Sequence, residues 1–263
     1  MTEPILALLF GLLIGSFLNV CIHRWPRGRS VVRPRSHCVR CRKLIAWHDN
    51  IPVLSYVLLR GRCRHCGKKI SARYPTVEVL NGLLWGLFVW KLGWGVEAAK
   101  MCVFSSMALA LVFTDLEKRI LPDEFTLGGT LVGLAFAPFT PIHDESSMGL
   151  LWAAGVELNG PMLSLAQAAI GAAVPAFFLW GGGWVYLKLR KREGLGFGDV
   201  KLMVMIGAFL GLQATLATLL LGSIAGSVIS LLYIWIAKKD ASTYQLPFGT
   251  FLGAAAIAIA VMA

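Results

Sequence analysis

Two aspartates at the ends of apolar segments are the residues best suited to chemistry. Asp115 directly follows an apolar run at residues 98–114, and Asp199 stands at the start of a second run. An ionisable side chain beside a membrane-type segment is costly and is by default a candidate functional residue. Two carboxyl groups held close together cannot both ionise, so one keeps a proton while the other acts as a general base on water. Such a pair predicts aspartic-peptidase chemistry; the alternative is two solvated acids at helix ends.

Small and charged residues surround these aspartates. Alternate glycines from Gly194 to Gly198 remove steric bulk before Asp199, which would let a substrate backbone approach it closely. None of the five histidines lies inside an apolar segment, which disfavours a Ser–His peptidase and excludes a His-Glu-x-x-His zinc peptidase. The residues expected to support the catalytic pair are Asp123, Gly196, Gly198 and Lys201.

Four of the six cysteines form a second chemical pattern. They make two C-x2-C pairs, Cys38 with Cys41 and Cys63 with Cys66, and 21 residues separate the pairs. Two such knuckles can place four thiolates around a zinc ion. A site with four thiolate ligands has no open position for a substrate, so the predicted zinc is structural. The alternative is four free or redox-active cysteines.

The elements that must position these residues are membrane helices. Hydrophobic residues make up 57% of the chain and charged residues 15%, with a mean hydropathy of +0.69. Soluble domains contain roughly 45–50% and about 25%, so a soluble enzyme and a disordered tail are excluded. The uncharged run that ends at residue 22 is predicted to be an uncleaved span, because basic residues follow it rather than precede it.

We therefore predict an all-α polytopic membrane protein with about eight transmembrane helices. A first helix at 1–22 precedes a small domain at 23–75, which holds 14 Lys or Arg, one acid and the four paired cysteines. A seven-helix membrane domain at 76–263 follows. The charge-free stretch at 202–237 is too long for one span of about 20 residues, so we predict a break near 211–213. The remaining spans are predicted at 76–92, 98–114, 125–141, 164–187, 200–212, 214–236 and 246–262.

Basic residues predict the orientation of these spans. With the N-terminus outside, 22 of the 25 Lys and Arg residues fall in loops on the cytoplasmic side. The outside loop at 142–163 has none. The basic segment 23–43 is expected to contact anionic lipid headgroups. A nucleic-acid partner is disfavoured, because the domain is tethered to the membrane at both ends. The cytoplasmic loops are 23–75, 115–124, 188–199 and 238–245.

With these residues in view, the chain resembles the type IV prepilin peptidase family from about residue 11 to 253. The family's two catalytic aspartates correspond to Asp115, in an Asp-x7-Asp context, and to Asp199, in the Gly-x-Gly-Asp motif. Its cytosolic tetracysteine motif corresponds to the four paired cysteines. Further matching segments are Gly15–Val20, Trp47–Pro52, Leu59–Cys63, Ile70–Glu78 and Leu246–Gly249.

The resemblance implies two reactions at the cytoplasmic face of a bacterial inner membrane. Asp115 and Asp199 would cut a type IV prepilin or a type II secretion pseudopilin after the glycine that ends its leader. The new N-terminal residue would then be methylated from S-adenosylmethionine. The family points to residues 23–78 for methylation, where Glu78 is a candidate; the alternative for Glu78 is a helix cap at the membrane edge.

Two other function classes are weighed against this one. A transporter or channel would use the acids as proton or cation sites at mid-membrane and show weak internal symmetry, whereas the predicted spans put the acids at the membrane edge. A membrane scaffold with a zinc-ribbon domain that binds partners would need the cysteines but not the aspartates.

Overall fold

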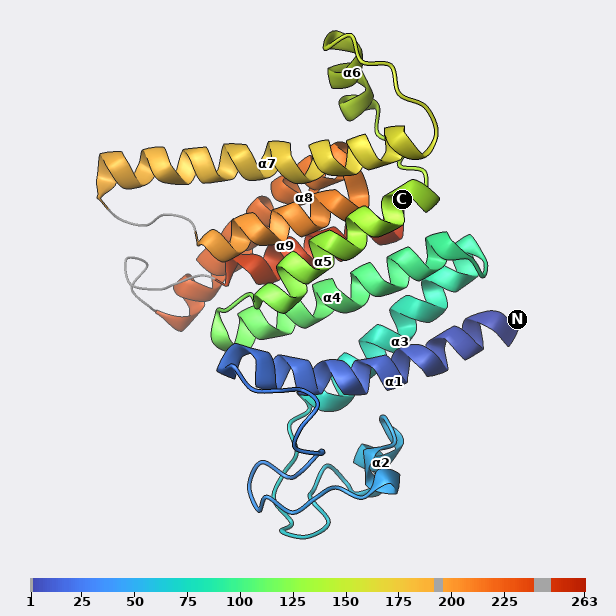
Figure 1. Cartoon of the computed structure of the whole chain (residues 1–263). Helices are drawn as coiled ribbons and strands as arrows, with labels where there is room; N and C mark the ends of the chain where they lie inside the picture. The colour runs from blue at the N-terminus through green and yellow to red at the C-terminus, as the bar shows by residue number, and fades with distance from the viewer. Residues whose placement is uncertain (1, 192–195, 239–246) are drawn as a thin grey trace. The chain divides into compact units, whose positions relative to one another are not determined.

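We describe the protein from a computed structural model, in which residues 2–191, 196–238 and 247–263 are described. Gly194, Leu246 and most of the predicted loop 238–245 lie outside these ranges. Within them the chain forms helices and turns, with no strand beyond two isolated bridges (Figure 1). The α-helices are α1 (Thr2–Arg24), α2 (Leu54–Leu58), α3 (Arg73–Leu92), α4 (Val96–Lys118), α5 (Asp123–Phe136), α6 (Glu145–Ala153), α7 (Pro161–Arg190), α8 (Phe197–Ala237) and α9 (Phe248–Met262). The 3-10 turns are η1 (Trp25–Arg27), η2 (Trp47–Asn50) and η3 (Ala137–Phe139).

Four described helices, α1, α4, α7 and α8, are long and apolar enough to cross a membrane. They support the predicted all-helical membrane protein. α3, α5 and α9 lie over other predicted spans but do not reach that length and composition, so the number of eight spans stays a prediction. α6 lies in the segment 142–163, for which the sequence predicts only a loop.

α8 is interrupted inside the charge-free stretch. Gly211 has φ +82° and ψ −179°, which is outside the helical region. The backbone N–H of Leu212 donates to Oδ2 of Asp144 at 2.5 Å and that of Gln213 does so at 3.4 Å. Oδ1 of Asp144 accepts from the first backbone N–H groups of α6. One buried carboxylate therefore caps two helix starts, and the predicted break near 211–213 is confirmed.

The chain divides into two compact units, residues 1–110 and 111–263. In the first unit α1 and α3 lie side by side (Figure 1). A Cβ on Gly15 would lie 2.7 Å from the Cα of Glu78, and a Cβ on Gly11 would lie 2.8 Å from the Cα of Gly82. These glycines let the two backbones approach closely, as small residues do between membrane helices. The predicted boundaries at 1–22, 23–75 and 76–263 stay a prediction.

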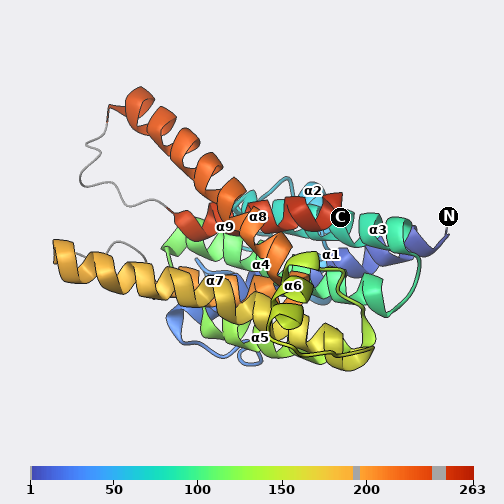
Figure 2. The ribbon, with the colours of Figure 1, turned by 90° about the horizontal axis from the view of Figure 1, so that it is seen from above.

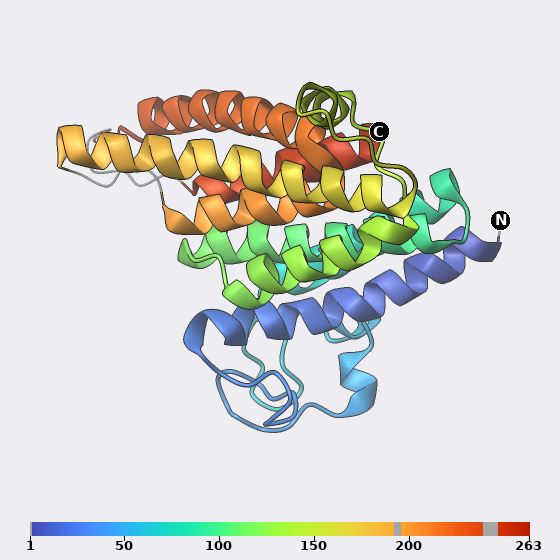
Figure 3. The ribbon, with the colours of Figure 1, turned by 45° about the horizontal axis from the view of Figure 1, so that its top comes forward.

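In the second unit α8 packs against α5, α7 and α9 (Figures 2 and 3). α9 meets the second half of α8, where a Cβ on Gly222 would lie 2.9 Å from the Leu252 side chain. α7 crosses α8 at glycines, where a Cβ on Gly171 would lie 2.8 Å from the carbonyl oxygen of Gly207. The second half of α8 exposes large apolar side chains such as Leu220 and Trp235. Such a surface suits contact with lipid tails. The buried first half of α8 carries Asp199 into this packed region.

Candidate active site and metal site

The two candidate catalytic aspartates lie at helix ends within the second unit, which begins at residue 111. Asp115 is near the C-terminal end of α4 and is 5% exposed, and Asp199 is in the first turn of α8. A Cβ built on Gly249 would lie 3.2 Å from Cγ of Asp115 and 3.2 Å from Oδ1 of Asp199. These two atoms are therefore at most twice that distance apart. The structure brings together two carboxyl groups that are far apart in the sequence.

The N-terminal end of α9 forms the third side of this site. α9 begins after Pro247, and the N–H of Thr250 in its first turn has one backbone acceptor, the carbonyl of Pro247 at 3.2 Å. The N–H of Thr250 donates to Oδ2 of Asp115 at 2.6 Å, and the hydroxyl of Thr250 donates to the same oxygen at 2.8 Å. Sequence reasoning missed Thr250. A threonine in the first helical turn after a proline was the available signal.

The supporting residues lie around the pair. Nζ of Lys201 is 2.7 Å from Oδ1 of Asp123, an ion pair that joins the start of α5 to the start of α8. A Cβ on Gly196 would lie 3.3 Å from Oδ2 of Asp199. A Cβ on Gly198 would lie 3.3 Å from the Leu121 side chain. The two glycines thus leave the space beside Asp199 free of side chains. Asp123 is occupied by its ion pair with Lys201.

The four paired cysteines of the first unit form one cluster. The sulfurs of Cys38, Cys41, Cys63 and Cys66 lie within 4.8 Å of one another, and none is in a disulfide. Tetrahedral ligation at about 2.3 Å needs sulfurs about 3.8 Å apart. Sγ of Cys38 and Sγ of Cys66 are 3.9 Å apart. Backbone hydrogen bonds from Cys66 and His65 lower the pKa of Cys63 to about 7, which favours a thiolate there. At Cys66 a backbone hydrogen bond from Lys68 is outweighed by desolvation and by the neighbouring thiols, which raise its pKa to about 11. The cluster could hold a metal ion.

Both knuckles have the same backbone geometry. In the first, the N–H of Cys38 donates to the carbonyl of Lys43 and the N–H of Arg42 donates to the carbonyl of Cys38, each at 2.9 Å. In the second, the N–H of Gly67 donates to the carbonyl of Cys63 at 2.9 Å. The residue after each second cysteine has a positive φ, +57° at Arg42 and +65° at Gly67. Two equivalent turns thus present four sulfurs to one point.

An ion pair fastens η2 to the second knuckle. Arg64 donates from Nε to Oδ2 of Asp49 at 2.8 Å and from its terminal nitrogen to Oδ1 at 2.6 Å. This hydrogen bonding holds the pKa of Asp49 below its ordinary value. A carboxyl group with a lowered folded pKa stabilises the fold at pH values above its unfolded pKa, and that contribution is lost as the pH falls through the folded pKa.

Glu78 is an anchor between α3 and the segment before α2. It is 7% exposed, and its Oε2 accepts from the N–H of Val53 at 2.8 Å. Val53 has φ +61°, which is rare for a β-branched residue. The Glu78 carboxylate therefore already holds one turn of the cysteine-containing segment.

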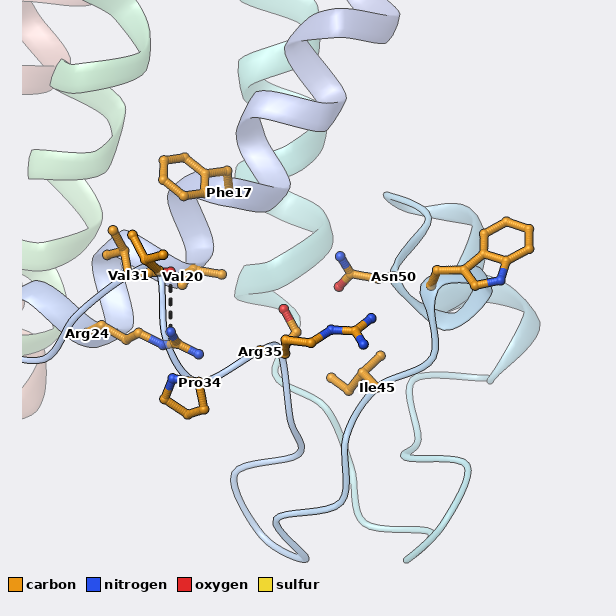
Figure 4. Close-up of a pocket in the computed structure, with 11 residues that line it drawn as sticks. Phe17, Val20, Arg24, Val31, Pro34, Arg35, Ile45 and Asn50 are labelled. Atoms are coloured by element: carbon orange, nitrogen blue, oxygen red, sulfur yellow. Dashed lines mark hydrogen bonds between the residues drawn. The ribbon is translucent and has the colours of Figure 1, made fainter.

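A cavity of about 320 Å³ lies where the end of α1 meets the segment 31–50 (Figure 4). Arg24 donates to the carbonyls of Ser30 and Val31 at 3.0 and 3.3 Å, which fixes one wall. The guanidinium of Arg35 and the amide of Asn50 also line the cavity. The apolar part of its lining includes Phe17, Val20, Ile45 and Trp47. The cavity thus combines apolar surface with two kinds of hydrogen-bond donor.

Comparison with known families covers both units. Residues 9–92 match the bacterial peptidase A24 N-terminal domain, and residues 102–232 match the type IV leader peptidase family. The first match contains the cysteine cluster, and the second contains Asp115 and Asp199. No solved structure matches the chain.

Several curated proteins are similar over most of the chain. A protein of Myxococcus xanthus named prepilin leader peptidase/N-methyltransferase is 41% identical over 85% of the chain, which spans 61% of that protein's length. Proteins of the same name from Aeromonas salmonicida and Pseudomonas putida are 36% and 34% identical; each match covers 95% of the chain and 87% of the relative.

Proposed function

Since the chain belongs to the type IV leader peptidase family, we propose that it removes the leader peptide of type IV prepilins or type II secretion pseudopilins and then N-methylates the new N-terminal residue. The names of its relatives support both reactions. The main support for the peptidase reaction is that the carboxyl groups of Asp115 and Asp199 both lie close to Gly249, which has no side chain to separate them. Cleavage follows the glycine that ends the leader.

In the proposed hydrolysis the two aspartates share one proton. The ionised carboxylate takes a proton from water, and the water oxygen bonds to the carbonyl carbon of the leader's last glycine. The protonated acid meanwhile gives its proton to the carbonyl oxygen. The C–N bond then breaks: its nitrogen takes the proton held by the first aspartic acid, and a hydroxyl of the intermediate returns a proton to the second. The pair regains its single proton.

For methylation, the cavity beside α1 is the proposed place for the methyl donor S-adenosylmethionine. Its volume of about 320 Å³ is within the usual range of small-molecule sites. The indole of Trp47 offers a face for the purine, and the guanidinium of Arg35 offers a partner for the carboxylate. The bound donor would supply the methyl group for the new amine. Glu78 stays a candidate methyltransferase residue, although its contact with Val53 equally suits an anchor.

The cysteine cluster is proposed to hold a structural zinc ion, for which the four thiols and their spacing are suitable. The proposed location is the bacterial inner membrane, with the N-terminus outside and the zinc domain in the cytosol. The distribution of Lys and Arg supports this orientation and contact with anionic lipids. A transporter, a scaffold and a nucleic-acid-binding role are not favoured.

Mass spectrometry of a prepilin co-expressed with the protein tests both reactions. We expect loss of the leader after its last glycine and the mass of one added methyl group on the new N-terminus. A Trp47→Ala variant should still cleave the leader but yield less methylated product. An intact leader in the presence of well-folded wild-type protein would contradict the proposal. Full methylation by the variant would contradict only the location of the donor.

A further inference from the structure

The two carboxyl groups of the candidate site are held differently. Oδ2 of Asp115 accepts two hydrogen bonds from Thr250, one from the backbone N–H at 2.6 Å and one from the hydroxyl at 2.8 Å. The hydroxyl is farther, at 3.3 Å, from its other acceptor, the carbonyl of Val112. Asp199 has a backbone hydrogen bond with Gly196, but among the described residues no threonine donates a hydrogen bond to its carboxyl group.

These contacts favour a negative charge on Asp115. A backbone N–H can only donate, so the oxygen that faces it must accept. The donor lies in the first turn of α9, where the positive end of the helix dipole stabilises an anion. Its N–H lies closer to Oδ2 of Asp115, at 2.6 Å, than to its backbone acceptor, the carbonyl of Pro247, at 3.2 Å. A hydroxyl donor on the same oxygen adds to this preference, because hydrogen bonds to an ionised acceptor are stronger than neutral ones.

We propose that Thr250 is a positioning residue that keeps Asp115 ionised, so that Asp115 is the general base and Asp199 carries the shared proton. The proposal rests on the peptidase function proposed above. It assigns the two steps of proton transfer to particular residues: water gives its proton to Asp115, and Asp199 protonates the carbonyl oxygen. When the C–N bond breaks, the nitrogen takes the proton from Asp115 and Asp199 regains one from the intermediate.

Other charges near Asp115 are unchanged by a substitution at position 250. Arg119 lies one turn further along the same segment, and Asp199 faces Asp115 from α8. Asp123 and Lys201 are paired with each other. Removing the hydroxyl of Thr250 therefore removes one hydrogen-bond donor to Asp115 and leaves the charged groups around it unchanged.

The test compares Thr250→Val, which removes the hydroxyl, with Thr250→Ser, which keeps it. Cleavage of one purified prepilin by the full-length protein in detergent is followed as a function of pH. In the valine variant the base needs a higher pH to ionise, so we expect the acidic limb of the kcat profile to move up by about one pH unit. We expect kcat to fall about tenfold on that limb, with KM changing less, and the serine variant to keep the wild-type profile.

An unshifted acidic limb in Thr250→Val would overturn the proposal. Equal loss of activity in the valine and serine variants without a shift would indicate a packing role and would overturn it too. Thr250→Ala removes the same hydroxyl with less bulk and must show the same shift if valine perturbs folding. Asp115→Asn and Asp199→Asn are assayed in parallel. Activity in both would refute the peptidase site itself, whereas inactive asparagine variants beside an unshifted valine variant would refute only the role of Thr250.

Discussion

Gly249 stands where a side chain would separate the carboxyl groups of Asp115 and Asp199. A Cβ at this position would lie 3.2 Å from Cγ of Asp115 and 3.2 Å from Oδ1 of Asp199. Gly196 and Gly198 similarly leave space beside Asp199 and against Leu121. At the scale of single residues, the site is thus shaped by three glycines as well as by two acids.

A Gly249→Ala substitution should reduce cleavage by about 100-fold or more, because a methyl group would push the two carboxyl groups apart and misplacement of about 1 Å costs about that factor. The measurement is the initial rate of leader removal from a purified prepilin. Gly128→Ala is the matched control, since a Cβ there meets no atom within 4 Å. A Gly249→Ala variant as fast as this control would contradict the described geometry.

The two aspartates were predicted from the sequence as the catalytic pair because charges next to apolar runs are unusual. The sequence could not identify Thr250, because a hydrogen bond from the start of α9 to the end of α4 depends on how distant segments pack. It also could not show that Lys201 pairs with Asp123 across α8 and α5. Residue types are visible in a sequence, whereas the direction of a backbone N–H group is not.

Asp144 connects three helices of the second unit. Asp144 is 2% exposed, and its carboxylate accepts from the starts of α6 and of the second half of α8. The carbonyl of the same residue accepts from Nε2 of Gln167 in α7 at 3.1 Å. One residue thus fixes the positions of three helices around the break at Gly211.

An Asp144→Ala substitution should lower the free energy of unfolding by about 2–3 kcal/mol, since it removes the caps of two helices and leaves buried N–H groups unpaired. Thermal unfolding of the protein in detergent measures this loss. Glu145→Ala is the control, because Glu145 is the exposed neighbouring acid. Equal unfolding temperatures for the two variants would show that the hydrogen bonds of Asp144 do not stabilise the fold by this amount.

At the scale of elements, the length of the charge-free stretch was enough to predict the break in α8, because no single span needs so many apolar residues. The cap that stabilises the break could not be predicted, since Asp144 comes from another part of the chain. α6 was also missed, because a helix of 9 residues leaves little periodic signal in a sequence.

For the whole molecule, the apolar composition predicted the membrane class, and the cysteine spacing predicted the cluster of four sulfurs. The number of spans was less accessible, because α3, α5 and α9 are shorter or less apolar than a typical spanning helix. Composition reports the average environment of a chain and does not resolve helices near the threshold of spanning.

The cysteine cluster and the aspartates belong to different parts of the chain, so metal loss should affect the two reactions unequally. A Cys38→Ser variant should lose its zinc, and its methylation should fall at least as much as its cleavage. Elemental analysis and paired assays on one prepilin measure this, with Cys102→Ser as the control outside the cluster. Stoichiometric metal in a variant lacking all four clustered cysteines would contradict the zinc site.

The central claim is that Asp115 and Asp199 together activate water. The most direct measurement is leader removal from a purified prepilin by Asp115→Asn and Asp199→Asn variants, beside Glu124→Gln, which changes an exposed acid nearby. The account predicts that both asparagine variants stay folded and lose cleavage almost completely, while Glu124→Gln cleaves at the wild-type rate. Cleavage at the wild-type rate by either asparagine variant would contradict it.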